Sequence, residues 1–317
     1  MKTEVSQDID KARVLLEGGQ LVAIPTETVY GLGANALNED ATRQIFKVKN
    51  RPFYDPLIIH TSRVERLHEW DLTIPSSLEQ LAKSHWPGPL TILIPRSHLI
   101  PPIITAGLDR VAVRIPRHPI TNTLLESLKF PVAAPSANPF GSVSPSRAEH
   151  VQKYFDGVVE LILDGGPAQV GIESTIVGEE NGRIIVYRLG GVPLEEIEAL
   201  VGKVEVRTSS SEPSAPGMLS QHYSPGKSII SIESQENLDQ LSDESTGVIV
   251  HSLTDPLSYS KLVRIETDEK MENTAQSFYH ALHQMAENAA TKSILIERIE
   301  DFGLGRAIND RLKRAGA

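Results

Sequence analysis

One ten-residue stretch limits how this chain can fold, because it is rich in Ser, Pro and Gly. It reads Thr208-Ser-Ser-Ser-Glu-Pro-Ser-Ala-Pro-Gly217. Such a composition offers little apolar surface to bury and interrupts both helices and strands. The stretch therefore predicts a linker between two separately built parts. We expect a first domain over residues 1–205, a linker over residues 206–227 and a second domain over residues 228–317.

The first part alternates short apolar runs with amphipathic segments, which is typical of a mixed α/β domain. The apolar runs predict strands near residues 21–24, 57–59, 90–94, 111–115, 132–134, 158–163, 174–177 and 183–187. The amphipathic segments predict helices near residues 9–17, 38–47, 76–84, 120–128, 144–155 and 194–201. In the helix at 38–47, Asn38 is expected to be the N-cap. In the helix at 144–155, Ser144 is expected to be the N-cap and Pro145 the first helical residue.

The second part shows a more regular alternation of strands and helices, which predicts a small parallel-sheet domain. Strands are expected near residues 228–232, 247–251, 261–265 and 293–296. Helices are expected near residues 236–241, 273–289 and 305–314.

Composition excludes several classes of protein. The 317 residues are 40% hydrophobic, enough to bury a core, and include no cysteine. The lack of cysteine rules out disulfides, thiolate nucleophiles and Cys-ligated zinc. No apolar run approaches the length that spans a bilayer, and the N-terminus has no signal-peptide pattern, so we expect a cytoplasmic protein with no membrane partner.

The net charge of −10 argues against a protein that grips a nucleic acid mainly through phosphates. Cations nevertheless gather at two places in the first part. One group is Arg43, Lys47, Lys49 and Arg51, and the other is Arg110, Arg114 and Arg117. Local positive charge on an acidic background favours a pocket for a small anion.

Familiar catalytic motifs provide little support for a function. Residues 31–36, Gly-Leu-Gly-Ala-Asn-Ala, nearly match a dinucleotide fingerprint, but Thr26-Glu-Thr-Val-Tyr30 separates them from the preceding strand. His280 and His283 have a spacing that could hold a metal, although no carboxylate partner is evident and a packing or solvated face is favoured. No G-x-S-x-G elbow supports a serine hydrolase.

Seven polar turns at strand ends carry the informative chemistry. They are Pro25–Gly33, Lys47–Leu57, Trp86–Thr91, Arg114–Pro119, Ala134–Asn138, Ser144–Ser146 and Gly171–Thr175. A single turn of this kind would be structural. Seven of them, pairing hydroxyls with cations, predict one polar cleft.

Taken together, these residues resemble the threonylcarbamoyl-AMP synthase (YrdC-like) family over nearly the whole chain. The resemblance lies in Pro25–Gly33, Lys49-x-Arg-Pro52, Pro135-Ser-Ala-Asn138 and Glu173-Ser-Thr175. Ala215-Pro-Gly-Met218 and His222-Tyr-Ser-Pro225, followed by an α/β region, resemble the long form of the family. The resemblance implies a YrdC-like catalytic domain with a twisted mixed sheet and a small Rossmann-like C-terminal domain.

The family condenses L-threonine, bicarbonate or CO2, and ATP into L-threonylcarbamoyladenylate and pyrophosphate. This nucleotidyl transfer is the first step of N6-threonylcarbamoyladenosine formation at tRNA position 37, and a downstream transferase machinery completes it. The reaction needs no protein nucleophile, and the sequence offers no obvious one. The resemblance also implies Mg2+ on the ATP phosphates, held mostly by ATP itself.

The resemblance assigns residues to two substrates. Those expected to hold L-threonine are Thr28, His60, Arg114, the Ala134 backbone and Ser174. Those expected to hold ATP are Lys49, Arg51, Asp55, Arg110, Ser136, Ser144, Arg188, His222 and Tyr223. Arg114 would pair with the threonine carboxylate, Lys49 and Arg51 would face phosphate, and Ser144 would add the amides of a helix N-terminus.

The linker is expected to close over the nucleotide through His222 or Tyr223. It departs from the family at Leu219 and Gln221, where basic residues are common. Two rival functions were weighed against this one. An RNA-binding module is disfavoured by the acidic total, so we do not expect this chain to bind tRNA strongly. A hydrogenase-maturation type of carbamoyltransferase would add a zinc finger, which a chain without cysteine cannot form.

Overall fold

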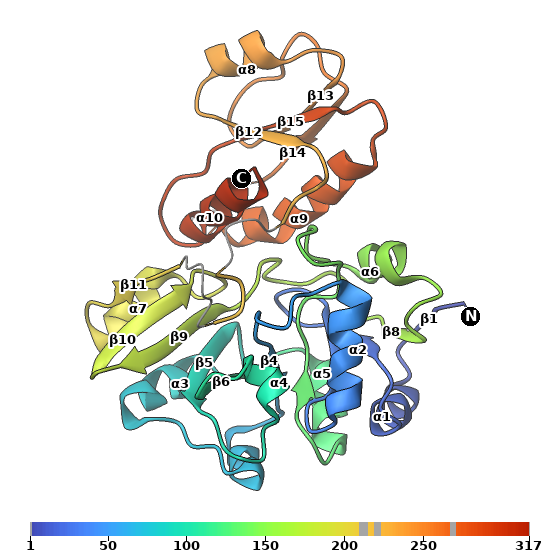
Figure 1. Ribbon diagram of the computed structural model, residues 1–317. Coiled ribbons are helices and arrows are strands. Elements are labelled where there is room, and N and C mark those ends of the chain that lie inside the picture. The colour runs from blue at the N-terminus through green and yellow to red at the C-terminus, as the bar shows by residue number, and fades with distance from the viewer. Residues whose placement is uncertain (1, 209–214, 219–222, 267–270, 317) are drawn as a thin grey trace.

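The computed structural model describes residues 2–208, 215–218, 223–266 and 271–316. Each of the two sheets within these ranges belongs to its own domain (Figure 1). The N-terminal domain, residues 2–206, carries the larger sheet, and the C-terminal domain, residues 228–316, sits over one side of it.

The larger sheet is mixed. In spatial order its strands are β1 (Glu4–Ser6), β8 (Leu161–Leu163), β2 (Val22–Ile24), β3 (Gly31–Asn35), β7 (Val132–Ala133), β4 (Ile58–His60), β6 (Arg110–Arg114), β5 (Leu90–Pro95), β9 (Thr175–Glu180), β10 (Arg183–Arg188) and β11 (Glu205–Val206). Parallel and antiparallel neighbours alternate irregularly along it, because hairpins such as β9–β10 are inserted between crossover strands.

Helices cover this sheet and complete its core. They are α1 (Ile9–Glu17), α2 (Glu39–Lys49), α3 (Glu79–His85), α4 (Pro102–Thr105), α5 (Pro119–Ser127), α6 (Ala148–Phe155) and α7 (Leu194–Val201), with 3-10 turns at Val64–Trp70 and Ser76–Leu78. Asn38 caps α2 as the sequence predicts, since its side chain accepts the Ala41 N–H. α1 buries Ala12, Leu15 and Leu16, the face that its apolar spacing predicts.

One helix start was predicted wrongly. α6 begins at Ala148 with Arg147 as its N-cap, not at Ser144. The backbone before it is held by distant partners instead, since the Pro145 carbonyl accepts the Tyr30 N–H and the Ser146 carbonyl accepts the Ala168 N–H. Ser144 therefore lies outside the helix, and the expectation that it brings helix N-terminal amides to the nucleotide is wrong.

The glycine-rich stretch at residues 31–36 contains β3, a strand that pairs with β2 and β7. Gly31 leaves little room for a side chain, because a Cβ there would lie 3.1 Å from Ala134 Cβ. The glycines thus serve close packing within a sheet, which removes the dinucleotide fingerprint as an alternative.

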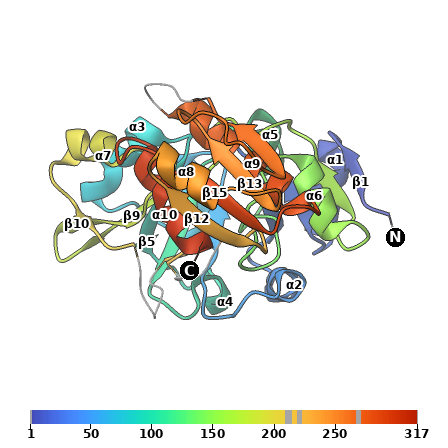
Figure 2. The same cartoon turned by 90° about the horizontal axis from the view of Figure 1, so that it is seen from above.

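The C-terminal domain has a four-stranded parallel sheet, in agreement with the predicted alternation. Its strands in spatial order are β12 (Ser228–Ile232), β15 (Ser293–Glu297), β13 (Thr246–Val250) and β14 (Lys261–Arg264), and its helices are α8 (Gln235–Leu241), α9 (Glu272–Glu287) and α10 (Gly305–Ala315). α9 and α10 face the N-terminal domain, while α8 lies on the far side of the sheet (Figures 1 and 2).

The two domains share apolar contacts. Val29, Val143 and Ile172 of the N-terminal domain pack in one cluster with α9 and α10 side chains, including Phe278 and Leu312. The described end of the linker is buried too, because Ala215 and Met218 pack against β-strand side chains of the N-terminal domain. The linker composition predicts little burial, so this contact is a difference from expectation.

Candidate active site

A small cavity lies at strand ends of the larger sheet, beneath the C-terminal domain. Its volume is about 60 Å³. The lining residues are Thr26, Thr28, Val29, Gly31, Arg51, Pro56, Ile58, His60, Arg114, Ala134, Pro135, Ser136, Glu173, Ser174, Arg188, Pro216, Gly217 and Tyr223. All five residues assigned to threonine from the sequence lie on this wall, together with four of those assigned to ATP.

Arg114, the last residue of β6, is fixed from three sides. Its Nη1 donates to Thr28 Oγ1 at 2.7 Å, its Nε donates to the Gly88 carbonyl, and its Nη2 lies 2.7 Å from Glu27 Oε1. Arg114 and Glu27 are both buried, with exposed fractions of 4% and 1%. The guanidinium is therefore held in place before any ligand arrives.

His60 and Ala134 lie beside Arg114 on the cavity wall. His60 ends β4 and is the register partner of Arg114 on β6. Burial and then Arg114 lower the pKa of His60 to about 3, so its imidazole is neutral. Its buried Nδ1 has no hydrogen-bond partner among the described residues. The Ala134 amide already donates to the Ile58 carbonyl, so a ligand contact at Ala134 would use the carbonyl.

A second group links three strands through Ser174. Its hydroxyl lies 2.7 Å from Thr91 Oγ1 and accepts Arg188 Nη2 at 3.0 Å. Arg188 Nε also donates to the Ser174 carbonyl. Ser174 precedes β9, Thr91 belongs to β5 and Arg188 ends β10, so the sheet order brings all three together.

The first cationic cluster divides into lining and supporting residues. Arg51 lines the cavity and pairs with Asp55, whose carboxylate lies 2.8 Å from its Nη2. Lys49 stands behind the wall, where its ammonium donates to the carbonyls of Ser136 and Asn138. Burial and then Arg51 hold the pKa of Lys49 well below its usual value. Lys49 thus supports the Ser136 loop in this structure instead of facing open space.

Ser144 and Arg110 do not line the cavity. The Ser144 hydroxyl donates to Glu173 Oε1 at 2.6 Å, so it supports a lining residue. Arg110 lies at the opposite end of β6 from Arg114, where it pairs with Glu180 and donates to the Tyr187 hydroxyl. The assignment of Arg110 to the nucleotide stays a prediction, and Arg110 makes no contact with the other assigned residues that the structure describes.

The linker forms one wall of the cavity. Gly217 has a positive φ of 81°, and a Cβ there would lie 3.1 Å from Arg188. Tyr223 is buried and lies above the cavity, with its ring centroid 5.8 Å from that of Tyr279 on α9. His222, Leu219 and Gln221 fall outside the residues that the structure describes.

Sequence reasoning missed the carboxylates that hold this site. Glu27 pairs with Arg114, and Glu173 binds Ser144 and side chains of the C-terminal domain. Both residues stand inside the motifs Pro25–Gly33 and Gly171–Thr175. Their position beside hydroxyl residues in predicted turns was the available signal.

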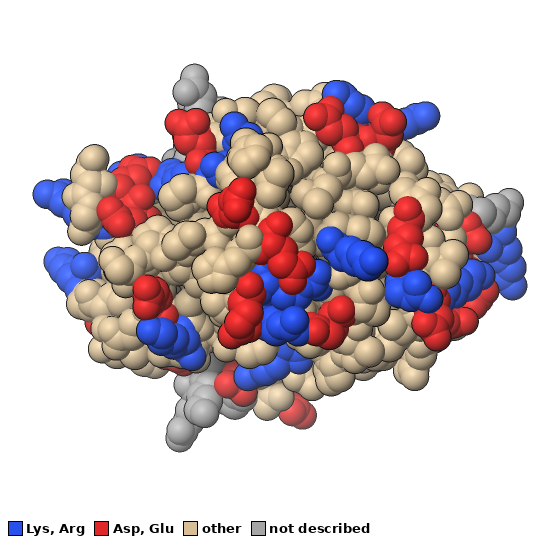
Figure 3. Space-filling view, turned by 90° about the horizontal axis from the view of Figure 1, so that it is seen from below, with Lys and Arg blue, Asp and Glu red and all other residues tan. Residues whose placement is uncertain are grey.

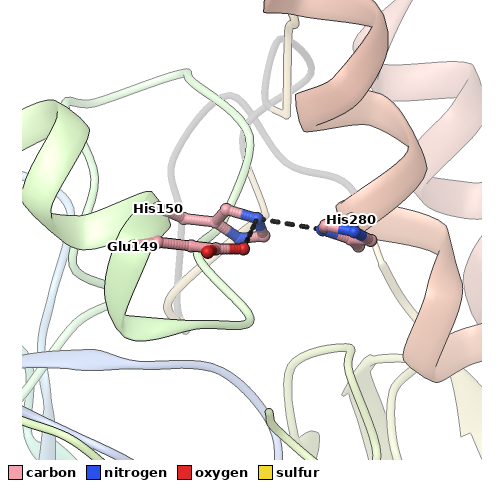
Figure 4. A group of neighbouring side chains, drawn as sticks. All are labelled: Glu149, His150 and His280. Carbon is pink, nitrogen blue, oxygen red and sulfur yellow. Dashed lines mark hydrogen bonds and ion pairs between the residues drawn. The ribbon is translucent and has the colours of Figure 1, made fainter. Parts of the chain in front are cut away.

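Three histidines meet where the two domains touch. The ring of His150 on α6 lies 3.8 Å from that of His283 and 5.3 Å from that of His280, both on α9. Glu149 lies beside His150 and His280 (Figure 4). The sequence offers no obvious carboxylate for a metal site, but the fold supplies Glu149. His150 Nδ1 accepts the Ser146 N–H, so the imidazole proton is assigned to Nε2. Nε2 lies 3.2 Å from His280 Nδ1 and can donate to it. This arrangement favours a hydrogen-bonded chain over a metal.

Acidic and basic side chains are interspersed on the face of the N-terminal domain that points away from the C-terminal domain (Figure 3). That face carries no broad field of one sign, unlike a surface that binds a nucleic acid backbone. Among the described residues, no helix is long and apolar enough to cross a membrane.

Comparisons with known proteins agree with this geometry. Residues 14–190 match the family described as "Telomere recombination", and residues 192–317 match the family described as "Threonylcarbamoyl-AMP synthase, C-terminal domain". A threonylcarbamoyl-AMP synthase from Pyrococcus abyssi (strain GE5 / Orsay) is 41% identical over 94% of this chain and 90% of its own length. A threonylcarbamoyl-AMP synthase from Bacillus subtilis (strain 168) is 37% identical over 97% of this chain and 92% of its own length.

A solved structure described as P. abyssi Sua5 complexed with L-threonine superposes with a TM-score of 0.91. It is 39% identical and covers 97% of this chain and 94% of its own. Both domains are therefore shared with a relative whose structure was solved in complex with L-threonine. The chain belongs to the threonylcarbamoyl-AMP synthase family, and its activity is the synthesis of threonylcarbamoyl-AMP, the first step of threonylcarbamoyladenosine formation in tRNA.

Proposed function

We propose that L-threonine binds against Arg114, Thr28, His60, Ser174 and the Ala134 carbonyl. The observation that carries this proposal is the buried Arg114, which lines the cavity while Thr28, Gly88 and Glu27 fix its orientation. A preset guanidinium suits a carboxylate, which it can bind through two parallel N–H groups. The relative crystallised with L-threonine supports the same choice of ligand.

We propose that the ATP phosphates lie toward Arg51 and Arg188, with Ser136 and Tyr223 beside the nucleotide. Arg51, Arg114 and Arg188 are the cations on the wall, and Glu173 is the carboxylate there. Glu173 is already bound by Ser144, Tyr279 and Arg311, so the free charge of the wall is positive. Fixed positive charge stabilises a transferring phosphoryl group without reorganising when charge develops.

In the proposed reaction the threonine amine attacks CO2 and loses a proton, which gives a carbamate. A carbamate oxygen then attacks the α-phosphorus of ATP, and the bond to the β-phosphate oxygen breaks to release pyrophosphate. The proton that the amine loses passes to water, because the lowered pKa of His60, about 3, makes its imidazole too weak a base to take it. Neutral His60 lies beside Arg114 and can accept a hydrogen bond at its free Nδ1, which would orient the amine. The protein contributes position and charge and forms no covalent intermediate.

Mg2+ bound to ATP would neutralise part of the negative charge of the phosphates. Of the nearby carboxylates, Asp55 is already paired with Arg51 at 2.8 Å and does not line the cavity. Glu173 is fully engaged by Ser144, Tyr279 and Arg311. With both carboxylates engaged, Mg2+ would be held mostly by the nucleotide.

The linker has to move for ATP to enter. A cavity of about 60 Å³ holds a few water molecules, whereas sites for drug-sized ligands measure roughly 300–1,000 Å³. Pro216, Gly217 and Tyr223 occupy the side on which the nucleotide is proposed to lie. We propose that residues 206–227 open to admit ATP and close again to exclude water from the carbamate and the adenylate.

The product is an activated acyl adenylate and hydrolyses readily, so a transferase acting on tRNA must take it up soon after release. We propose that the protein works in the cytoplasm beside such a transferase. The face that points away from the C-terminal domain carries mixed charge. This supports release of a small-molecule product to the transferase and argues against a stable complex of this protein with tRNA.

A substrate-resolved kinetic test separates the two halves of the site. Thr28→Val should raise the KM for threonine with little change for ATP, because it removes a hydroxyl from the Arg114 side. Arg51→Gln should raise the KM for ATP with little change for threonine. Pyrophosphate release measured against each substrate in turn gives both constants, and the reverse pattern would contradict this division of the cavity.

A further inference from the structure

Glu173 stands on the cavity wall of the N-terminal domain but is held mainly from the C-terminal domain. Tyr279 of α9 donates its hydroxyl to the carboxylate, 2.9 Å from Oε2 and 3.1 Å from Oε1. Arg311 of α10 donates Nε to Oε2 at 3.1 Å. Ser144, from the N-terminal domain, supplies the remaining contact at 2.6 Å. Two helices of the second domain therefore determine where an active-site carboxylate lies.

Both residues from the C-terminal domain are removed from water. Arg311 and Tyr279 are each 0% exposed, and Glu173 is 6% exposed. Burial alone would raise the pKa of Glu173, but Arg311 and Arg188 outweigh it and lower the pKa to about 2. Glu173 is thus a permanent anion at neutral pH, because a cation from the other domain faces it.

Glu173 is joined directly to proposed substrate-binding groups. The next residue is Ser174, whose hydroxyl and carbonyl both bind Arg188. The Glu173 carbonyl accepts the Gly191 N–H, which ties the same loop to the segment after β10. A displacement of Glu173 therefore moves Ser174 and the partner of Arg188 with it.

Arg311 also contacts the linker. Its guanidinium carbon lies 5.4 Å from the ring centroid of Tyr223, and Tyr223 in turn stacks on Tyr279. The same two side chains of the C-terminal domain therefore contact the Glu173 loop and the linker wall of the cavity.

We propose that Arg311 and Tyr279 are positioning residues of the active site, acting through Glu173 on Ser174 and Arg188. The C-terminal domain then completes the site instead of only covering it. This inference rests on the proposed function, because Ser174 and Arg188 are proposed ligands of threonine and ATP. It assigns that domain a direct share in kcat and in the KM values.

The decisive variants are Arg311→Gln and Tyr279→Phe in the full chain. Arg311→Gln should lower kcat/KM by roughly 10- to 100-fold, since misplacement of binding groups by about 1 Å has effects of that size. Tyr279→Phe keeps the ring stack and removes one donor, so a smaller loss is expected. A Glu173→Gln/Arg311→Gln double variant should lose no more than the worse single variant, because both act through one contact.

Arg306→Ala is the matched control. Arg306 also lies on α10 and pairs across the domains with Glu195 at 3.2 Å, but it is partly exposed and lies away from the cavity. It should retain wild-type kinetics. Arg311→Gln kinetics equal to those of Arg306→Ala would overturn the inference. If Arg311→Gln does not fold, wild-type kinetics in Tyr279→Phe would overturn it equally.

A pH profile separates positioning from simple loss of folded protein. Without Arg311, burial should raise the pKa of Glu173, which then faces Ser144, Arg188, Tyr223 and Tyr279. The ratio of variant to wild-type kcat/KM should therefore fall as the pH is lowered from 8 toward 5, whereas a ratio constant with pH would contradict the inference. Failure of the proposed function would appear differently, as a wild-type enzyme that forms no adenylate. Failure of the present inference would leave wild-type activity intact and appear only in the variants.

Discussion

Arg114 at the end of β6 and Glu27 after β2 form an ion pair of 2.7 Å inside the N-terminal domain, and Arg114 also lines the cavity. Glu27 accepts the Arg117 N–H as well, so the carboxylate joins two turns. The cation proposed for threonine therefore already has a partner, and its replacement has two separable effects.

Arg114→Gln should weaken threonine binding roughly 10- to 100-fold, as expected for a lost hydrogen bond to a charged group. It should also destabilise the fold by about 3–5 kcal/mol, because Glu27 is left buried without its cation. Adding Glu27→Gln should restore part of the stability but not the affinity. Calorimetric titration of threonine and denaturant unfolding measure the two effects, and unchanged threonine affinity in folded Arg114→Gln would contradict the assignment.

Lys49→Met should reduce stability as well as nucleotide use. The ammonium of Lys49 binds two loop carbonyls, and each carbonyl left unpaired in the interior costs about 1–3 kcal/mol. The Ser136 loop should shift, which raises the KM for ATP. Lys47→Met is the control, since Lys47 is exposed on the same helix. A Lys49→Met protein with wild-type stability and a raised KM for ATP would instead indicate direct contact with phosphate.

Acid should weaken the contact between the domains. Burial and then the neighbouring histidines lower the pKa of His150 to about 2, and burial lowers that of His283 to about 4. Unfolding releases both histidines to their usual pKa near 6.5, so the unfolded chain binds more protons below that pH. Stability is then complete above pH 6.5 and falls as the pH drops toward 4.

Thermal midpoints between pH 7.5 and 4.5 test this pH dependence. His150→Gln should flatten the curve, whereas His68→Gln, which alters an exposed histidine, should leave its slope unchanged. Equal slopes in wild type and His150→Gln would show that the histidine cluster does not carry the effect.

Gly171 allows the loop before β9 to lie against α9. A Cβ there would lie 2.4 Å from Gln276 Cα and 2.6 Å from the Ala275 carbonyl oxygen. Gly171→Ala should therefore separate the domains locally and lower activity. Gly166→Ala is the matched control, because Gly166 has nearly the same φ but open space around it. A similar loss of about 1–2 kcal/mol in both variants would reflect left-handed backbone strain alone.

Local sequence patterns predicted most helices and strands of both domains, because apolar periodicity and caps act over a few residues. Asn38 and the apolar face of α1 are examples. The short edge strand β1 and the sheet position of β3 depend on partners more than 90 residues away, and no local pattern reveals them. The wrong helix start predicted at Ser144 has the same cause, since the amides of Tyr30 and Ala168 bind the carbonyls of Pro145 and Ser146 and override the capping signal.

The sequence predicted which motifs form the candidate site, but it did not predict which side chains contact each other within it. The five residues assigned to threonine lie on one cavity wall, as a cleft at strand ends requires. The partners Glu27 and Glu173 were missed, because nothing in a sequence says which buried carboxylate meets which arginine. Contacts of Arg311 and Tyr279 depend on how the domains dock, and that information lies in no single motif.

Synthesis of the adenylate itself is the central claim, and isotope incorporation tests it directly. The full chain is incubated with ATP, L-threonine, Mg2+ and 13C-bicarbonate, and the products are examined by mass spectrometry with a parallel pyrophosphate assay. The account predicts a threonylcarbamoyladenylate that carries one 13C atom, formed together with pyrophosphate only when all three substrates are present. Pyrophosphate release that is independent of threonine and bicarbonate, with no labelled adenylate, would contradict it.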